Sequence, residues 1–449
     1  MDKERLQDIA HQAVQEALAA GAESAEAYLG LNRELEIIVR QQKVDTLKLA
    51  EESGLGLRVF KKQKTGFAFT SILEAANLTE TAEQAMANAS IAADNPYVFL
   101  PEPASHYPDF EQYDPAINQV STESKIALAK ELEAGVQDCR VKIIHEAGYT
   151  DIEEEIVLVN SRGVNLYSRG TYFGLSLALA AEENGDKQNG FALDYRTRYL
   201  DLNPVRVSQE AVRRAVRMLG AENGSGGEMP VILEPYVARG FLGLMAASLS
   251  AEAVQKGKSL LADKLGQKIA SGLITLADDG LLAGGLASLP FDGEGTPMQR
   301  KILIREGILQ QFLFNCYTAA KAKSQSTGNG VRASFKETPR VGTTNLFLEP
   351  GSLTLEQMMQ GLEKGLLVTE IMGMHTANPV SGDFSVGASG LLIEKGRVVK
   401  PVRGLALAGN VLDLFAKVKA VGSDLTFYGS RGTPSLLIER LSVSGRQED

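Results

Sequence analysis

Histidine, cysteine and carboxylate side chains could bind a catalytic metal, and two such residues are adjacent in this sequence. His145 and Glu146 lie in the stretch IIHEAGYTD, which begins like the zinc-binding motif of a metalloprotease. In such a site the imidazole binds the metal, while the carboxylate activates a water molecule. A second histidine must follow on the same helix, yet the next histidine in the sequence is His375. The pair alone is therefore not sufficient for a zinc site.

The residues around this pair have the pattern of a β-sheet and not of a helix. Apolar and polar residues alternate on both sides of Gly148, so we expect two antiparallel strands with this glycine at the turn. The acidic run at 153–155 is expected on a solvated strand edge, where charge discourages pairing with another chain. A strand that carries His145 cannot supply a zinc-binding helix.

The other histidines and the two cysteines are scattered along the chain. His11 is expected on the first helix and His106 in a proline-rich loop, while Cys139 and Cys316 lie far apart in sequence. The stretch VGASG at 386–390 lacks the strand-to-helix context of a nucleophile elbow. The residues alone therefore predict no catalytic constellation, no metal site and no cofactor in this chain.

Composition and charge exclude several classes of function. The chain has 449 residues with 46 Lys and Arg against 56 Asp and Glu, which gives a net charge of −10. Direct binding to nucleic acid needs a basic face, so we expect none. No apolar run reaches the length of a membrane span and the N-terminus has no apolar signal core, so we expect a cytoplasmic protein without membrane contact.

The order of sequence patterns predicts an α+β protein with two domains, largely antiparallel sheets and flanking helices. Strand patterns without regular strand–helix alternation disfavour a doubly wound fold. The glycine-rich stretch at 221–230 indicates a linker, so we place the domains at 1–222 and 228–449. Apolar periodicity predicts helices at 2–20, about 79–93, 122–137, near 206–219 and near 410–417.

One segment of the second half places several polar residues close together. Residues 373–425 contain short apolar strands separated by glycines, with His375, Asn378, Asp383 and Ser385 in one loop-and-strand region. One interpretation is that the glycines serve hairpin turns and that Asp383 caps a turn. The other is a functional site.

The chain resembles the TldD/PmbA family, the so-called modulators of DNA gyrase, and within it the PmbA branch, which is also called TldE. The resemblance covers nearly the whole length. It is carried by NSRGVNLYSRGTYFGLSLALAA, KGKSLLADKLGQKIA, GLASLPFDGEGTP and NPVSGDFSVGASGLLIEKGRVVKPVRGLALAGN. It implies that the C-terminal domain is the counterpart of a metalloprotease domain.

In the family, the TldD branch carries a zinc site with a His-Glu-x-x-x-His helix and a cysteine ligand near the C-terminus, and the PmbA branch lacks it. Aligned by eye from KSLLADKLG, this helix falls on LGLMAA, with Leu242 and Ala247 at the histidine positions and Gly243 at the glutamate position. The C-terminal loop at 424–434 has no cysteine. The resemblance thus implies no zinc in this chain, with zinc expected in a TldD-type partner.

The resemblance further implies a subunit of a TldD–TldE-type cytoplasmic metalloprotease complex that processes or degrades unfolded peptides, as in peptide-precursor maturation and antitoxin proteolysis. This chain would be the non-zinc partner that shapes the substrate chamber, and in isolation it could form a homodimer. A peptide held there as an added strand requires close backbone approach, which small residues permit. The residues expected to line the chamber are His375, Asn378, Gly382, Asp383, Phe384 and Ser385.

Two alternatives remain open from the sequence. One is a self-sufficient peptidase or other hydrolase that uses a site without a familiar motif. The other is a protein-binding module that modulates gyrase, because the acidic charge disfavours contact with DNA but not with a protein.

Overall fold

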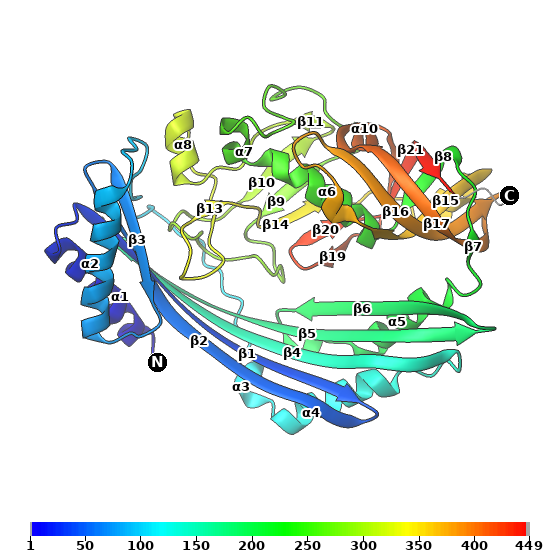
Figure 1. The fold of residues 1–449 in the computed structure, drawn as a ribbon, viewed down its shortest axis with the longest axis horizontal. Helices are drawn as coiled ribbons and strands as arrows, with labels where there is room; N and C mark the ends of the chain where they lie inside the picture. Colours follow the sequence, from blue (N-terminus) through cyan, green and yellow to red (C-terminus); the bar gives the residue numbers. More distant parts are fainter. Residues whose placement is uncertain (1, 446–449) are drawn as a thin grey trace.

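The computed structural model describes residues 2–445, and it confirms the predicted α+β class with antiparallel sheets and flanking helices. A six-stranded antiparallel sheet in the order β3-β2-β1-β4-β5-β6 forms the N-terminal half (Figure 1). Its strands are β1 Ser24–Arg40, β2 Lys43–Lys61, β3 Lys64–Thr70, β4 Val141–Asn160, β5 Asn165–Glu183 and β6 Asp186–Arg196.

Helices cover the outer face of this sheet in two groups. The stripe Leu6, Ala10, Ala13 and Ala17 makes α1 amphipathic, and Asp2 caps its N-terminus by accepting a hydrogen bond from Arg5 N–H. Together with α2, this helix buries one end of the sheet, while α4 and α5 bury the other end. The helices are α1 Lys3–Ala19, α2 Ala75–Ile91, α3 Ala116–Gln119, α4 Thr122–Ala134, η1 Tyr199–Asp201 and α5 Pro204–Val216.

Two expectations about β4 are wrong. Gly148 lies within one long strand and not at a turn, because β4 pairs with both β1 and β5 along its length. A Cβ atom at Gly148 would lie 2.4 Å from Ser176 Oγ on β5, so the glycine makes room for a neighbouring side chain. For the same reason the acidic run at 153–155 is not at a sheet edge: Glu153 is buried against Arg169.

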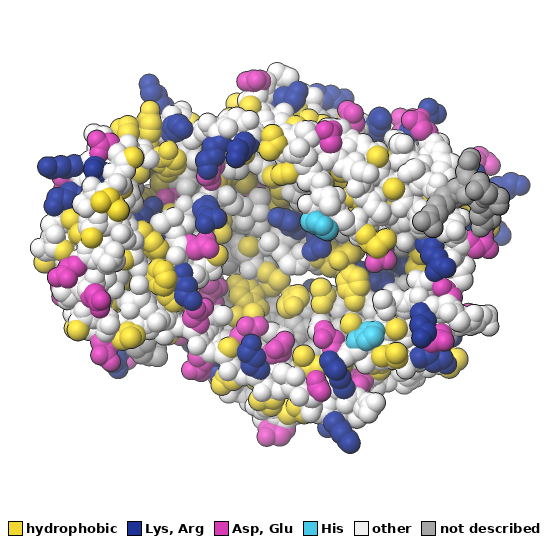
Figure 2. All heavy atoms as spheres, in the orientation of Figure 1, with side chains coloured by type: hydrophobic (Ala, Val, Ile, Leu, Met, Phe, Trp, Pro, Cys, Tyr) yellow, Lys and Arg dark blue, Asp and Glu magenta, His cyan; other side chains and the backbone are white. Residues whose placement is uncertain are grey.

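The inner face of the sheet turns toward the C-terminal half. Near one end, Phe335 packs over the backbone of Gly54 and Gly56, and at the other end Phe191 contacts Tyr236 with ring centroids 5.1 Å apart. Between these two contacts the sheet and the C-terminal half leave a hollow, which is visible in Figure 2.

Glu154 lies on this inner face, and no hydrogen bond or ion pair of its side chain is found within residues 2–445. Burial raises the pKa of its carboxyl group, and the same charge contributes to raising the pKa of Tyr28 and Tyr172 beside it. The inner face thus carries a carboxyl group whose ionisation is disfavoured by burial.

The C-terminal half contains a sheet that closes on itself. β8, β15, β16 and β17 follow one another, and β21 pairs with β8 on one side and β17 on the other. The strands are β7 Glu222–Asn223, β8 Gly227–Leu233, β15 Lys364–Met372, β16 Asp383–Glu394, β17 Arg397–Asn410, β18 Val418–Val421 and β21 Leu436–Ser444. The interval between the two predicted domains contains the end of β7 and the start of β8, and β7 pairs with β17 of this half.

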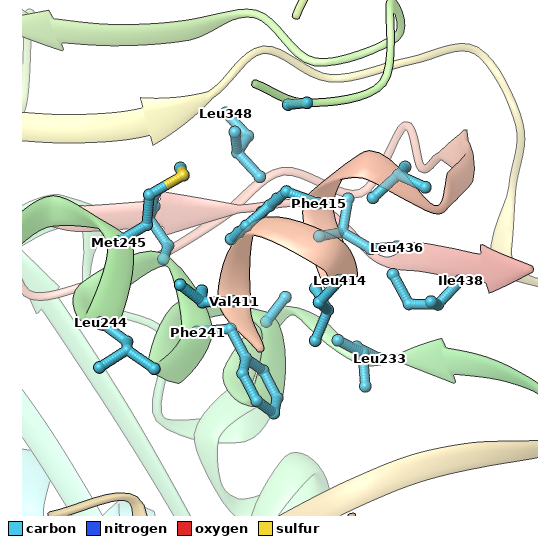
Figure 3. Packing of buried hydrophobic residues seen from close by; sticks show 14 of the residues in the cluster. Leu233, Phe241, Leu244, Met245, Leu348, Val411, Leu414, Phe415, Leu436 and Ile438 are labelled. Carbon is cyan, nitrogen blue, oxygen red and sulfur yellow. The ribbon is translucent and has the colours of Figure 1, made fainter. Parts of the chain in front are cut away.

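A second sheet, in the order β11-β10-β9-β14-β20-β19, lies beside the closed one. Figure 3 shows part of the shared core, in which α6 and α10 pack their apolar side chains against strand residues such as Leu233 and Leu436. The strands are β9 Leu276–Asp279, β10 Arg300–Arg305, β11 Ile308–Leu309, β14 Asn345–Leu348, β19 Thr426–Tyr428 and β20 Arg431–Thr433, with β12 Gly330–Val331 and β13 Arg340–Val341 forming a separate pair.

Short helices complete this half: α6 Pro235–Ala246, η2 Ala247–Leu249, α7 Ala251–Gln255, α8 Cys316–Ala322, α9 Leu355–Gln360, η3 Met374–Thr376 and α10 Val411–Ala416. The predicted helix near 410–417 is confirmed as α10. Within residues 2–445, no helix combines the length and the apolar character needed to cross a membrane.

A buried cluster of charges joins the two halves. Glu26 on β1 binds Arg58 on β2, with 3.0 Å between Oε2 and Nη2, and also Arg332 from the C-terminal half. Arg58 in turn lies 3.6 Å from Glu294 Oε1. Burial alone would raise the pKa of Glu26, but the two guanidinium groups hold it below its ordinary value.

This cluster predicts that Glu26→Gln is strongly destabilising. The change leaves Arg332 buried without a carboxylate partner, and removing one member of a buried ion pair costs about 3–5 kcal/mol. We expect that loss in the free energy of unfolding measured by urea denaturation. Glu52→Gln is the matched control, because Glu52 binds Lys336 across the same interface with both side chains largely exposed, and it should cost under about 1 kcal/mol. Equal losses for both variants would contradict the prediction.

A second prediction concerns Glu154. Because its folded-state pKa is raised above the unfolded value, the protonated carboxyl contributes stability below the unfolded pKa, and this contribution is lost as the pH rises through the folded pKa. Glu154→Gln should therefore match the parent protein at pH 4 and exceed its melting temperature at pH 8. A variant that is less stable than the parent at pH 8 would show that the charged carboxylate has an attractive partner.

Candidate functional site

Helix α6 separates the core of the C-terminal half from two adjoining cavities. Pro235 occupies the first turn, where no backbone N–H is needed, and starts the helix. Phe241 and Met245 point into the core, while Gly243 lies on the open side. The cavities have volumes of about 500 and 510 Å³. Both are lined by Gly243 and Arg431, so these two residues mark the point where the cavities meet.

Arg431 comes from β20 and reaches the helix only because residue 243 is a glycine. A Cβ atom at Gly243 would lie 2.9 Å from Arg431 Nη1. Burial lowers the pKa of Arg431, and the positive charge of Arg239 lowers it further. Arginine side chains keep their charge in proteins, so Arg431 is a cation at neutral pH.

Arg239 projects from α6 into the same cavity and lies against two aromatic rings. Its guanidinium carbon is 5.0 Å from the ring centroid of Tyr236 and 5.6 Å from that of Tyr428. The two rings are themselves in edge contact at 5.2 Å, and Phe191 of β6 continues the stack. This stack fixes the cavity wall against the N-terminal half.

Figure 2 shows Lys and Arg side chains, with a histidine next to them, on the wall of the hollow formed by the C-terminal half. The cavity that contains Arg239 also has apolar walls. Its lining residues are Tyr236, Arg239, Gly240, Gly243, Leu244, Ile371, Met374, His375, Ala377, Pro379 and Arg431.

The residues expected to line a chamber lie in different surroundings. His375 lies on η3 and lines the cavity beside Arg431. Asn378 accepts hydrogen bonds from the N–H groups of Val380 and Ser381, and so forms a tight turn. Gly382 has φ +77°, and a Cβ atom there would be 2.7 Å from Leu260. These two residues therefore have structural roles, as the turn interpretation of this segment expects.

The next three residues belong to β16. Asp383 accepts hydrogen bonds from Asn410 and Ser381, and these hold the pKa of its carboxyl group below the ordinary value. Phe384 is buried in the core, with its ring centroid 4.8 Å from that of Phe241. Ser385 is exposed. Of the six expected residues, His375 is the one that lines a cavity beside α6.

The three positions assigned to the degenerate zinc motif are divided between the two sides of α6. Leu242 is fully buried in the core, whereas Gly243 and Ala247 line the cavity. Around Gly243, the side chains that line the cavities include one histidine and one carboxylate, His375 and Glu252, and they line different cavities.

These residues do not fit a zinc ion. Within residues 2–445, no three His, Cys, Asp or Glu side chains are grouped closely enough to hold a metal. The guanidinium of Arg431 lies against the backbone of Gly243, where it would repel a cation. His145 is exposed on β4, and the strand expected for it is confirmed.

Arg239, Arg431 and Tyr428 are parts of the site that sequence reasoning missed. They lie on three elements, α6, β19 and β20, and the helix is far in sequence from the two strands. These strands are too short for alternation to show which side chains face inward. The available signal was the glycine at 243 within an apolar helix, because a glycine at such a position can reflect close packing by another group.

Comparisons with known proteins match the chain along most of its length. Family models for the PmbA/TldA metallopeptidase match residues 25–89 as domain 1, 115–219 as the central domain and 226–445 as the C-terminal domain. The metalloprotease PmbA of Escherichia coli O157:H7 is 28% identical over 96% of this chain and 94% of its own length.

Two further relatives widen the comparison. A metalloprotease TldD homolog of Haemophilus influenzae is 28% identical over 88% of this chain and 87% of its own length. A crystal structure of a candidate modulator of a DNA gyrase from Thermotoga maritima is 27% identical, with a TM-score of 0.89, and the alignment covers 98% of this chain and all of that one. With all three family domains matched in order and the whole fold shared, the chain belongs to the PmbA/TldD family.

Proposed function

We propose that this chain is the PmbA/TldE-type subunit of a metalloprotease complex, in which it shapes the substrate chamber and a TldD-type subunit supplies the zinc site. The observation that supports this proposal is the open side of α6, where Gly243, Ala247 and Arg431 line a cavity. Gly243 and Ala247 are the positions that the family resemblance assigns to the glutamate and the second histidine of the zinc motif. A cavity lined in this way can bind a chain but cannot activate a water molecule through a metal.

The open edge of β16 supports an extended peptide as the ligand. β15 pairs with β16 only from Gly387 onward, whereas β17 pairs with β16 from Asp383. Within residues 2–445, residues 384–386 therefore pair with a strand on one side only. Such an edge can bind an unfolded peptide through its main chain, which gives affinity with little sequence preference.

The family relationship supports a TldD-type subunit as the partner. Relatives named PmbA and TldD are both similar to this chain over most of its length, so two subunits of one fold can assemble through equivalent surfaces. In the absence of the partner, the same surface would support a homodimer. Peptide maturation and antitoxin proteolysis in the cytoplasm are the processes that such a complex would serve.

A self-sufficient hydrolase could use a cysteine thiolate as its nucleophile. Cys316 is buried, and burial together with Glu294 and Asp292 raises the pKa of its thiol, which opposes formation of a thiolate. Cys139 is exposed on the surface. Neither cysteine favours the hydrolase alternative.

The proposed function predicts that this chain and a TldD-type chain, each purified, differ in zinc content and in peptidase activity. This chain alone should contain well under one zinc per molecule, should leave an unstructured peptide uncleaved and should sediment as a dimer. Mixing it with a TldD-type chain should produce a complex with zinc and peptidase activity. Zinc content is measured by metal analysis, the oligomeric state by sedimentation and the activity by a peptide-cleavage assay. Each measurement is made on the two chains and on their mixture.

Two outcomes would contradict the proposal. One is about one tightly bound zinc in this chain alone. The other is a TldD-type chain that cleaves peptide equally well with and without this chain under conditions in which the complex forms.

A further inference from the structure

We propose that Arg239 and Arg431 form a carboxylate-binding site in the cavity beside α6, and that its ligand is the carboxylate of a bound peptide. That the ligand is a peptide rests on the function proposed above. The anion-binding character of the site rests on the charges of this chain alone.

The two guanidinium groups lack carboxylate partners within residues 2–445. No Asp or Glu lines the cavity that contains both arginines. Carboxylates of this region bind other cations. Glu234 binds Arg217, with 2.5 Å from Oε1 to Nη1, and Glu210 binds Arg214, with 2.6 Å from Oε1 to Nε. Glu252, which lines the adjoining cavity with Arg431, binds Lys256. The positive charge of the cavity is therefore not neutralised by the protein.

Neighbouring like charges that are partly removed from water destabilise each other. The effect is visible in the lowered pKa of Arg431, to which burial and Arg239 both contribute. The aromatic stack holds Arg239 in place, and Gly243 admits Arg431 to the helix, so the fold brings the two charges together despite this cost. An anionic ligand would remove the repulsion.

A carboxylate suits the geometry better than a simple ion. Guanidinium groups present planar pairs of N–H donors that match the two oxygens of a carboxylate. Beside them, Leu244, Ile371 and Met374 provide apolar walls for the side chain next to that carboxylate. The volume of about 510 Å³ is in the range that binds small ligands.

The test is a binding measurement on the purified chain without any partner. The probe is a peptide that lacks Asp and Glu and carries a fluorophore at its N-terminus, prepared with a free C-terminal carboxylate and, as the control, with a C-terminal amide. A third peptide has the amide and one internal Glu, which separates a side-chain carboxylate from a terminal one. Fluorescence anisotropy gives each dissociation constant.

Variants at position 243 test the site without removing either arginine. Gly243→Glu places a carboxylate beside Arg431 and should weaken binding of the free-acid peptide about tenfold, because hydrogen bonds to charged groups contribute that much. Gly243→Gln has the same size without the charge and should bind more tightly than Gly243→Glu. Either side chain brings a Cβ atom to 2.9 Å from Arg431 Nη1 and must shift that guanidinium. Because both variants share this shift and the gain in helix propensity, only the difference between them reports the effect of the charge.

Removing the arginines completes the set. Arg431→Gln should weaken binding about tenfold, while Arg5→Gln on α1, at the far end of the molecule, should leave it unchanged (Figure 1). Binding that depends on Arg431 and on either the terminal or the internal carboxylate supports the inference and identifies its source. Equal binding of all three peptides, or binding unaffected by both Arg431→Gln and Gly243→Glu, overturns it.

The outcome is independent of peptidase activity. If a TldD-type chain proves inactive with this one but the carboxylate-dependent binding is found, the proposed function fails and the binding site stands. If the complex cleaves peptide while Arg431→Gln binds all peptides as the parent does, the proposed function stands and the site fails.

Discussion

The buried ion pairs around Glu26 determine how the two halves of the molecule face each other. Arg332 reaches across from the C-terminal half to the inner face of the large sheet, and its side chain is fully buried there. Asp292 belongs to the same region, where burial and Glu294 raise the pKa of its carboxyl group to about 7. The position of the hollow depends on this contact, because it holds one end of the sheet against the second half while the aromatic stack at Phe191 holds the other.

Between these two contacts, helix α6 has two sides of different character. Its core side packs Phe241 and Met245 among apolar residues, whereas its open side lines cavities that contain Arg239 and Arg431. The scaffold of a metallopeptidase domain is thus retained while the charge of its central cavity is positive. One fold can carry different sites, so the charge of this cavity and not the family scaffold decides what it can bind.

Much of the fold could be predicted from the sequence, since helices such as α1 and α10 have clear apolar periodicity or caps. The long strand β4 shows the limit, because a glycine and three consecutive glutamates resemble a turn and an edge until their partners Ser176 and Arg169 are known. The candidate site was less predictable. His375 was expected in a chamber and lines a cavity. Arg239 and Arg431 could not be identified in the same way, because the sequence does not show which arginines lack a carboxylate partner. The pairing of charges is set by tertiary contacts between segments far apart in sequence.

The closed sheet of the C-terminal half has a consequence for biosynthesis. β21 is the last strand of the described chain, yet it lies between β8, the strand that opens this half, and β17. The sheet cannot close until β21 has left the ribosome. Every strand of the large N-terminal sheet, in contrast, is complete by Arg196. During translation the N-terminal sheet can therefore form before the C-terminal half is folded. The inner face of the N-terminal sheet then stays exposed to solvent and to chaperones until β21 has been synthesised.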